Sequence, residues 1–413
     1  MDFEPSDRAK ALLERVRAYM QEHVYPNERE VEEALDREVD RDTPFPAILV
    51  ELREKARAEG LWNLALPNEA HGGYGLSNLD YGVVSEEIGR ATLVAPYCFN
   101  VQPPDSGNME ILGEHATPDQ RDKWLQPLLD GDIRSCYSMT EPDTAGSDPT
   151  GLACRAELDG DHWVINGKKW WTTNALGAQV AIVMAVTDPD GPKHARATMI
   201  LVPTDTPGFT MVRPLSNMGH TAGPGHWEIH YENCRVPAEL CTLGARGSGF
   251  KISQDRLGPG RIHHCMRLIG VAERALELMV QRARDREMFG TALIERQFIQ
   301  DFIAKSRIEI DQARLVTWFA AWKLDQVGNR AAREELSITK VAVPTMALNV
   351  VDRAIQVWGG AGVSDDTPLA GMYRYNRMLR IGDGADEVHK QVIARMELAK
   401  AGVRETTQAG AAA

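Results

Sequence analysis

The chain has 413 residues, of which 43% are hydrophobic and 25% are charged, a composition that excludes an intrinsically disordered protein and allows roughly two or three cores. It contains 46 Lys and Arg against 59 Asp and Glu. The resulting net charge of −13 opposes nonspecific binding to nucleic acid and to acidic membranes, so an anionic ligand would need local basic residues or helix N-termini.

The cysteines indicate a reducing compartment. They form no CxxC pair and have no His at metal-ligand spacing, which favours scattered thiols over disulfides or zinc. The N-terminus lacks the basic and apolar regions of a signal peptide, and no apolar run is long enough to span a bilayer. We therefore expect a soluble, cytoplasmic protein without a membrane partner, although a mature organelle protein would look the same. The cysteines are Cys98, Cys136, Cys154, Cys234, Cys241 and Cys265.

The N-terminal part, residues 1–133, is predicted to be an all-α domain. Ser6 or Asp7 can cap a first helix whose apolar residues follow a 3.6-residue period. Thr117 and Gln120 form a capping-box pattern with Pro at the first helical position. Two further helices are predicted from Pro46 to a stop at Gly60 and from Ser77 or Asn78 to Ile88.

Around Arg134 the apolar period changes from 3.6 to 2, which predicts strands. Asp159-Gly160 and Asn166-Gly167 are hairpin signals, and Val236-Pro237 ends the block. Strands without interleaved helices favour a small sandwich or barrel over a parallel sheet, so we predict a central β domain over residues 134–243. Its apolar strands are Val180 to Val186, Thr198 to Val202 and Trp227 to Tyr231.

The helical period then returns and predicts a four-helix bundle over residues 244–402. Pro344 predicts a kink or break within the third of these helices. Residues 403–413 have no apolar pattern and are predicted to be disordered. The fold class is therefore α+β, with helical, β and helical domains in that order. The four long helices are predicted from Phe250 to Met288, Ile294 to Gln326, Ala331 to Trp358 and Asp386 to Ala401.

Several common catalytic motifs are absent from the sequence. There is no GxGxxG after a strand, no P-loop, no HExxH and no GxSxG, which disfavours a Rossmann nucleotide site, phosphoryl transfer, zinc hydrolysis and serine-hydrolase chemistry. No metal site is predicted. The adjacent His263 and His264 are interpreted as solvated or structural side chains rather than a ligand pair.

Hydroxyls, a glycine, paired tryptophans and an Asn gather at two strand-to-loop junctions between Cys136 and Asn174. Such junctions are typical of cofactor sites, but an ordinary hairpin with surface tryptophans fits the same pattern. Six motifs occur in a fixed order, and the first three of them lie within this stretch. They are Thr140-Glu141-Pro142, Ala145-Gly146-Ser147-Asp148, the run from Asn166 to Asn174, Arg286 to Gly290 with Gln297, Gln356 to Gly362, and Arg374 ahead of Asp383-Gly384.

In order and spacing, these six motifs resemble the acyl-CoA dehydrogenase family over nearly the whole chain. The resemblance implies FAD, a homotetramer or homodimer, and α,β-dehydrogenation of an acyl-CoA thioester to the trans-2-enoyl-CoA. It also implies an electron-transfer flavoprotein as the acceptor. Asp383 and the Asp-Glu-Val-His run after it most resemble the branch of family members 10 and 11, without their kinase-like extension. That branch implies longer, branched or 4-hydroxylated acyl chains.

The resemblance also assigns cofactor residues. Met139, Thr140, Trp171 and Thr173 match positions that line the flavin ring, where hydroxyls and backbone N–H groups can stabilise the reduced flavin. Ser147 matches a serine that contacts phosphate or pantetheine groups. The ADP half of FAD, held partly by a neighbouring subunit, would contact Arg286, Phe289, Gln297, Gln356, Gly359 and Gly360.

Asp383 occupies the position of the family's catalytic glutamate and would remove the α-proton of the substrate. Judged by its local sequence alone, it could equally be an N-cap or turn aspartate before the last helix, a role that Asp386 fits as well. Arg261 matches a family arginine near the site, and Gly384 follows the base. Arg246, Lys251 and Lys168 are candidate cations for the phosphates of CoA.

The sequence departs from the family pattern in three places. Asp replaces Glu at 383, which shortens the arm by one methylene, and Ala385 replaces a hydroxyl residue. One extra residue precedes Ala145. The second base position used by some branches holds Gly260.

Two other readings stay open. A nitroalkane-oxidase-like or acyl-CoA-oxidase-like flavoenzyme would use the same fold, and an Asp base is shared with nitroalkane oxidases. A non-catalytic, DNA-associated family member is disfavoured by the net charge of −13.

Overall fold

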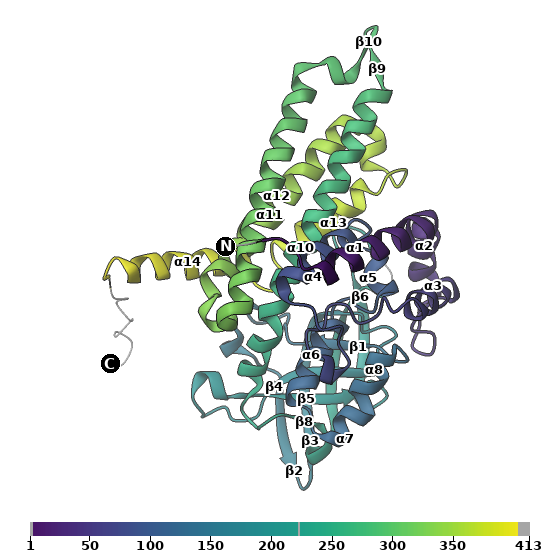
Figure 1. Cartoon of the computed structure of the whole chain (residues 1–413). Helices are drawn as coiled ribbons and strands as arrows, with labels where there is room; N and C mark the ends of the chain where they lie inside the picture. Colours follow the sequence, from purple (N-terminus) through teal and green to yellow (C-terminus); the bar gives the residue numbers. More distant parts are fainter. Residues whose placement is uncertain (1–2, 222–223, 404–413) are drawn as a thin grey trace. The chain divides into compact units, whose positions relative to one another are not determined.

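The computed structural model describes residues 3–221 and 224–403, which fall into two compact units (Figure 1). One unit is Pro5–Gly260, and the other comprises residues 261–403 together with residues 3 and 4. Residues 5–133 and the predicted domain 134–243 belong to the first unit, and the three predicted domain boundaries stay predictions. The prediction of disorder for the tail falls, from residue 404 on, outside the described residues.

The first unit begins with helices whose caps follow the sequence signals. The Ser6 hydroxyl accepts a hydrogen bond from the Ala9 N–H, and both bonds of the Thr117/Gln120 capping box are present. A π-helical segment, Arg121–Leu125, interrupts the helix after this box. The α-helices are α1 (Asp7–Tyr19), α2 (Glu28–Glu38), α3 (Ala47–Ala58), α4 (Asn78–Gly89), α5 (Ala95–Cys98), α6 (Asp105–His115), α7 (Pro118–Gln120) and α8 (Gln126–Asp130).

A mixed sheet follows, with the strand order β6-β7-β3-β2-β4-β5-β8. β1 pairs with β4 in parallel, which the strand pattern did not predict, and most other pairs are antiparallel. The short helix α9 (Ala238–Cys241) leads from β7 to β8. The strands are β1 (Ser135–Ser138), β2 (Arg155–Asp159), β3 (His162–Thr173), β4 (Val180–Val186), β5 (Ala197–Pro203), β6 (Phe209–Leu215), β7 (His226–Pro237) and β8 (Thr242–Leu243).

The Asp159-Gly160 hairpin is confirmed, but the hairpin predicted at Asn166-Gly167 is wrong. β3 runs through this dipeptide, and its pairing with β7 shifts register between Ile165 and Gly167. A Cβ added at Gly167 would lie 2.6 Å from the Cys154 Cα, so the glycine permits close approach of two backbones instead of a turn. A bulge in a long strand has the same local signal as a turn.

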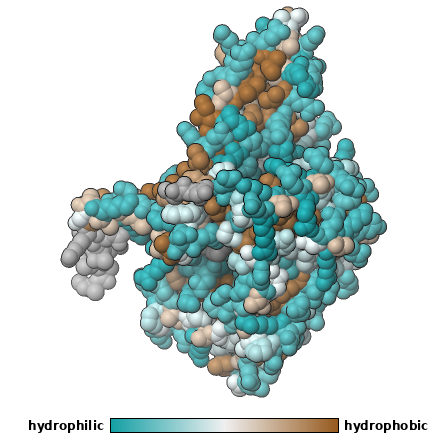
Figure 2. Space-filling model, in the orientation of Figure 1, coloured by the Kyte–Doolittle hydropathy of each residue, from teal (hydrophilic) through white to brown (hydrophobic). Residues whose placement is uncertain are grey.

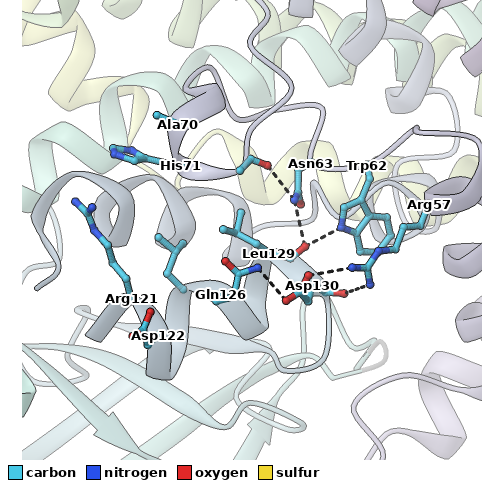
Figure 3. A pocket seen from close by; sticks show the side chains of 12 residues that line it. Arg57, Trp62, Asn63, Ala70, His71, Arg121, Asp122, Gln126, Leu129 and Asp130 are labelled. Atoms are coloured by element: carbon cyan, nitrogen blue, oxygen red, sulfur yellow. Dashed lines mark hydrogen bonds and ion pairs between the residues drawn. The ribbon is translucent and has the colours of Figure 1, made fainter. Parts of the chain in front are cut away.

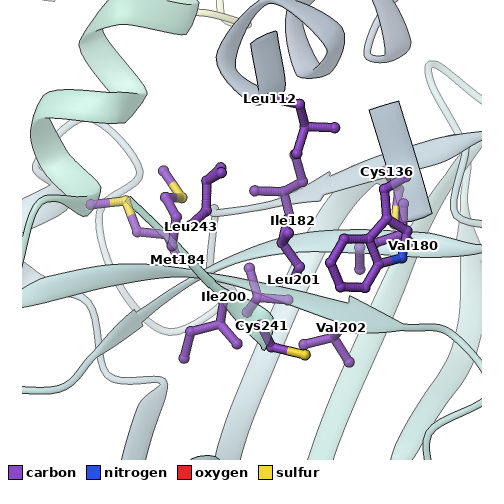
Figure 4. Packing of buried hydrophobic residues seen from close by; sticks show 14 of the residues in the cluster. Leu112, Cys136, Val180, Ile182, Met184, Ile200, Leu201, Val202, Cys241 and Leu243 are labelled. Carbon is purple, nitrogen blue, oxygen red and sulfur yellow. The ribbon is translucent and has the colours of Figure 1, made fainter. Parts of the chain in front are cut away.

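The core of the first unit lies between the sheet and helix α6 (Figure 4). All seven residues of β4 are buried, as expected of a strand that is apolar on both faces. Ile182 and Leu201 pack here with Leu112 of α6. The six cysteines of the chain all lie within the described residues, and each is buried and unpaired.

The second unit is helical, and its core joins residues of α10, α11, α12 and α13. α10 starts in the first unit and ends at Asp285, three residues before the predicted end, because a small hairpin of β9 (Glu287–Met288) and β10 (Thr291–Ala292) follows. The long helices are α10 (Gly249–Asp285), α11 (Gln297–Ala331), α12 (Arg333–Trp358), α13 (Leu369–Leu379) and α14 (Asp386–Lys400).

Two features of this unit differ from the predictions. The predicted break at Pro344 is absent, since α12 continues through it with Val343, Met346 and Ala347 buried in the core. Burial on both sides of the proline outweighs the one backbone hydrogen bond that it removes. Helix α13 was not predicted. Within the described residues, no helix is both long and apolar enough to cross a bilayer.

Candidate functional site

Two segments of the first unit that the sequence assigned to the flavin lie side by side. The Trp170 N–H donates to the Thr140 carbonyl at 3.0 Å, and the Lys169 ammonium donates to the Met139 carbonyl at 2.8 Å. The loop after β1 is thereby fixed to the end of β3. Met139, Thr140 and Thr173 are partly exposed, so a ligand can reach this junction.

A buried ion pair holds the loop in place. The Lys169 ammonium lies 2.8 Å from the Glu141 carboxylate, and their side chains are 0% and 3% exposed. Glu141 also accepts hydrogen bonds from the N–H groups of Ala153, at 2.6 Å, and Cys154, at 2.9 Å. Burial alone would raise the pKa of Glu141, but the charge of Lys169 and these hydrogen bonds outweigh it and lower that pKa. The sequence motifs contain both residues, but their pairing was not predicted.

Trp171 lies in an irregular part of β3. The pairing of β3 with β7 shifts register between Lys169 and Thr172, and Trp171 has a left-handed backbone with φ 52°. Bulges of this kind redirect side chains at functional sites. The indole is 37% exposed, and its ring centroid lies 5.1 Å from that of His226. Trp171 therefore offers an aromatic face next to Thr140 and Thr173.

His226 supports this strand and hydrogen-bonds the Thr173 hydroxyl through Nδ1 at 2.9 Å. Burial lowers its pKa to about 4, so it is neutral in the folded protein at pH 7. No motif in the sequence marked it. His226 lies on β7, which pairs with β3, and this pairing brings it opposite Thr173.

This histidine gives the folded protein an acid sensitivity. In the unfolded chain, the His226 imidazole is protonated once the pH falls below its ordinary pKa of about 6.5. In the folded protein it is protonated only when the pH falls to about 4. The unfolded state therefore binds more protons between these values, and stability falls as the pH is lowered through that window. We expect the thermal unfolding midpoint to fall less steeply from pH 6.5 to 4 in His226→Gln than in the wild type. Identical slopes would contradict this assignment.

Two of the residues assigned to the CoA phosphates have other partners. Arg246 binds both oxygens of Asp188, at 2.9 and 2.8 Å, and the Thr187 carbonyl. Lys251 is exposed and lies 3.4 Å from Asp255. Ser147 and Lys168 are exposed. These positions leave the phosphate assignment of Ser147, Lys168 and Lys251 a prediction, and Arg246 would have to share its guanidinium with Asp188.

Most residues predicted to bind the ADP half lie near the end of α10 in the second unit. The Trp358 indole N–H donates to the Leu278 carbonyl at 3.0 Å, so the end of α12 packs against α10 eight residues before Arg286. Phe289 is 89% exposed at the tip of the β9-β10 hairpin, where it adopts φ 51°. The remaining predicted residues, Gln297, Gln356, Gly359 and Gly360, are also exposed.

Asp383 lies in the loop between α13 and α14. Its backbone is left-handed, with φ 56°, and its side chain is 26% exposed. The N-cap of α14 is Ala385, and Asp386 is its first residue, where it forms an ion pair with Arg380. Asp383 is therefore not the N-cap, whereas its interpretation as a turn aspartate agrees with its place in the turn before α14. A strained aspartate that does not cap the helix is a candidate for chemistry.

Two cations fix the backbone of this loop. The Arg261 guanidinium donates from Nε to the Asp383 carbonyl at 3.0 Å. The Lys340 ammonium donates to the Leu379 carbonyl at 2.5 Å and to the Gly384 carbonyl at 3.4 Å. Gly384 has φ 109°, a backbone conformation that residues with a side chain rarely adopt, which favours glycine there. Arg261 thus contacts Asp383, the predicted base, through the backbone carbonyl of that residue, whereas Lys340 was not identified in the sequence.

His264 contacts the carboxylate itself, with Nε2 3.2 Å from Asp383 Oδ2. Of the two interpretations given for it, a solvated or a structural side chain, the structure favours the structural one, because the imidazole is largely buried. His264 is three residues after Arg261 on α10, which places both on one helix face. The three-residue spacing from Arg261 was the feature of the sequence that could have identified His264 as a site residue.

A separate cavity of about 420 Å³ lies among the N-terminal helices (Figure 3). None of the predicted site residues lines it. Arg57 on its wall is paired with Asp130, and the Trp62 indole donates to the Leu129 carbonyl. The charges that line it are thus partly neutralised, and we assign it no function.

The order of helices, mixed sheet and helices, with a pinned aspartate loop before the last helix, defines an acyl-CoA dehydrogenase fold. Family models match in three consecutive parts: the acyl-CoA dehydrogenase N-terminal domain over residues 6–132, the middle domain over residues 136–234 and the C-terminal domain over residues 247–398. The chain belongs to the acyl-CoA dehydrogenase family.

Two relatives illustrate the match. The probable acyl-CoA dehydrogenase FadE2 of Mycobacterium tuberculosis is 49% identical over 402 residues, which cover 97% of this chain and 98% of the relative. Acyl-CoA dehydrogenase family member 11 of Gallus gallus is 48% identical over 403 residues, which cover 96% of this chain and 51% of the relative. The chain thus spans about half the length of that vertebrate relative. The resemblance to members 10 and 11 is confirmed.

Solved structures agree. An acyl-CoA dehydrogenase candidate from Mycobacterium abscessus is 46% identical with a TM-score of 0.91, and the match covers 96% of this chain and 100% of that one. A glutaryl-CoA dehydrogenase from Mycobacterium smegmatis, in complex with FADH2, is 25% identical with a TM-score of 0.78. That match covers 97% of this chain and 96% of the other.

Proposed function

We propose that this protein is an FAD-dependent acyl-CoA dehydrogenase that converts an acyl-CoA thioester to the trans-2-enoyl-CoA. The observation that carries the proposal is Asp383: it stands at the family's base position, in a strained loop whose backbone is held by Arg261 and Lys340. A carboxylate fixed in this way is suited to proton abstraction, because a general base must be held within hydrogen-bond reach of its proton.

Features of both units fit FAD. In the first unit, the exposed face of Trp171 would cover the flavin, and Thr140 and Thr173 would supply hydroxyls to it. In the second, Arg282 Nε, Thr291 Oγ1 and Arg296 Nε are buried atoms for which the described residues provide no hydrogen-bond partner. These donors lie at the end of α10 and around the hairpin, next to the residues expected to bind the ADP half.

When bound, FAD supplies the two-electron acceptor for the hydride from Cβ of the substrate. The Asp383 carboxylate takes the α-proton, so that loss of one proton and one hydride leaves the α,β double bond. The exposed Trp171 ring would exclude water from a flavin bound against it. Lys169 and Glu141 keep Met139 and Thr140 in place during the reaction.

We further propose that the enzyme works as a homotetramer or homodimer and passes its electrons to an electron-transfer flavoprotein. Apolar side chains gather on the surface of the helical second unit (Figure 2). On α11, Ile308 is 56% exposed and Leu315 is 53% exposed, and seven residues apart they lie on one helix face. Burial of that face in a subunit interface would fit the expectation that a neighbouring subunit contributes to the ADP site.

The test is an anaerobic titration of the flavin-loaded protein with a panel of straight, branched and hydroxylated acyl-CoA thioesters. We expect bleaching of the flavin absorbance by at least one of them and formation of the enoyl-CoA. A nitroalkane serves as the second arm, because an Asp base is shared with nitroalkane oxidases. Bleaching by the nitroalkane but by no acyl-CoA would replace this proposal with the oxidase alternative.

Asp383→Glu should remain active with an altered preference for acyl chains, because the carboxylate gains one methylene of reach. The measurement is the ratio of kcat/KM values across the same acyl-CoA panel. A variant with full flavin content and no activity on any member would contradict reach as the reason for the aspartate.

A further inference from the structure

The carboxylate of Asp383 is held by a side chain that the dehydrogenation chemistry does not itself require. His264, on α10, places Nε2 3.2 Å from Asp383 Oδ2. The two residues are far apart in sequence but belong to the same unit. The His264 side chain is 12% exposed and that of Asp383 is 26% exposed, so the contact is shielded from most competing water.

The partners of His264 define its tautomer. Arg267 Nη2 lies 3.1 Å from His264 Nδ1, and a guanidinium can only donate. Nδ1 is therefore the unprotonated nitrogen, and the proton of the neutral ring is on Nε2, which faces Asp383. Burial lowers the pKa of His264, and the nearby charge of Arg267 lowers it further, while Asp383 opposes the shift only in part. The ring is thus a neutral donor to the carboxylate.

We propose that His264 is a positioning residue for Asp383, and that its Nε2–H orients the carboxylate that removes the α-proton. This inference rests on the proposed dehydrogenase function. Arg261 and Lys340 hold the backbone of the loop, and His264 holds the reacting group. Arg267 and the Tyr375 hydroxyl, 3.1 and 3.4 Å from Nδ1, hold the ring in turn.

A hydrogen bond donated to the ionised carboxylate favours that form, so His264 also makes Asp383 more acidic. Other charged and titratable groups surround the same loop, from each helix packed against it. Arg261 and Arg267 extend from α10 and Lys340 from α12, Tyr375 is on α13, and Asp386 and His389 are on α14. The three cations remain when His264 is replaced, so the change in the pH profile isolates the imidazole.

The test compares His264→Leu, which removes the donor, with His264→Gln, whose amide N–H₂ can reach the same position. His263→Gln is the matched control, because it removes the adjacent buried imidazole and leaves the contact with Asp383. In His264→Leu we expect kcat with a good acyl-CoA to fall about 10- to 100-fold with little change in KM. The acidic limb of its kcat/KM profile should move to higher pH. His264→Gln should recover most of the rate.

Wild-type rates and an unmoved acidic limb in a flavin-loaded His264→Leu would overturn the proposal. A second measurement is independent of turnover: ¹⁵N spectra of histidine-labelled protein should show a ring that is protonated at Nε2 and unprotonated at Nδ1 at pH 7. A signal from His264 with Nδ1 protonated would also overturn it. If wild-type protein is bleached by no acyl-CoA, the proposed function fails, and the ¹⁵N spectra still decide whether His264 donates to Asp383.

Discussion

Asp383→Asn is expected to retain a yellow, flavin-loaded protein whose bleaching by acyl-CoA is slowed more than about a hundredfold. The amide has nearly the shape of the carboxylate but cannot accept the α-proton. Asparagine tolerates the left-handed conformation, with φ 56°, better than other uncharged residues except glycine, so the loop should keep its backbone. The amide oxygen can still accept a hydrogen bond from His264. Loss of rate would therefore report loss of the base.

The bleaching rate is measured by stopped-flow absorbance under anaerobic conditions, after flavin content and the thermal midpoint have been matched to wild type. Asp352→Asn is the control, because Asp352 is an exposed aspartate on α12 of the same unit. Its rate should be that of the wild type. If Asp383→Asn bleaches as fast as this control, the base must be sought elsewhere.

The parts of the fold that could be predicted from the sequence depend on local chemistry. Ser6 and the Thr117/Gln120 box start helices through bonds that span three residues, and Asp159-Gly160 closes the hairpin between adjacent strands. Asn166-Gly167 has the same local signal, but there a partner strand more than sixty residues downstream, at Cys234, determines the outcome. The tendency of Asn-Gly to form a turn is overridden here because pairing of β3 with β7 buries more surface than a turn would.

In the site, too, the residues set by local sequence could be predicted and those set by distant contacts could not. Asp383 and Trp171 could be proposed as site residues because each occupies a defined place in a linear motif, and Arg261 because it matches a family arginine. His264 could not be separated from a solvated histidine, because its role depends on a loop more than a hundred residues downstream. His226 was missed for the same reason, since its partner Thr173 is on the neighbouring strand. Residues that support a reacting group are recognised by contact, not by spacing.

The second large effect is expected at the buried pair of Lys169 and Glu141. Lys169→Met would leave the Glu141 carboxylate buried without its counter-charge, which costs about 3–5 kcal/mol in comparable sites. We expect a lower thermal midpoint and weaker retention of FAD, because Lys169 also holds the Met139 carbonyl. Lys169→Met/Glu141→Gln should recover much of the stability, since an uncharged amide still accepts and donates hydrogen bonds. Equal midpoints for the single and double variants would show that the charge is not the cause.

The pH dependence distinguishes an unpaired charge from simple loss of packing. In the wild type the pKa of Glu141 is lowered, so its contribution to stability is complete above its ordinary pKa of about 4.5 and is lost as the pH falls. Without Lys169, burial becomes the dominant influence, and the folded-state pKa of this carboxyl should rise above its unfolded value. The deficit of Lys169→Met relative to wild type should then be largest near pH 7 and shrink toward pH 4.5, where the buried carboxyl is protonated. A deficit caused by lost packing of the lysine chain would instead be the same at both pH values, and unfolding midpoints of the two proteins across this range decide between them.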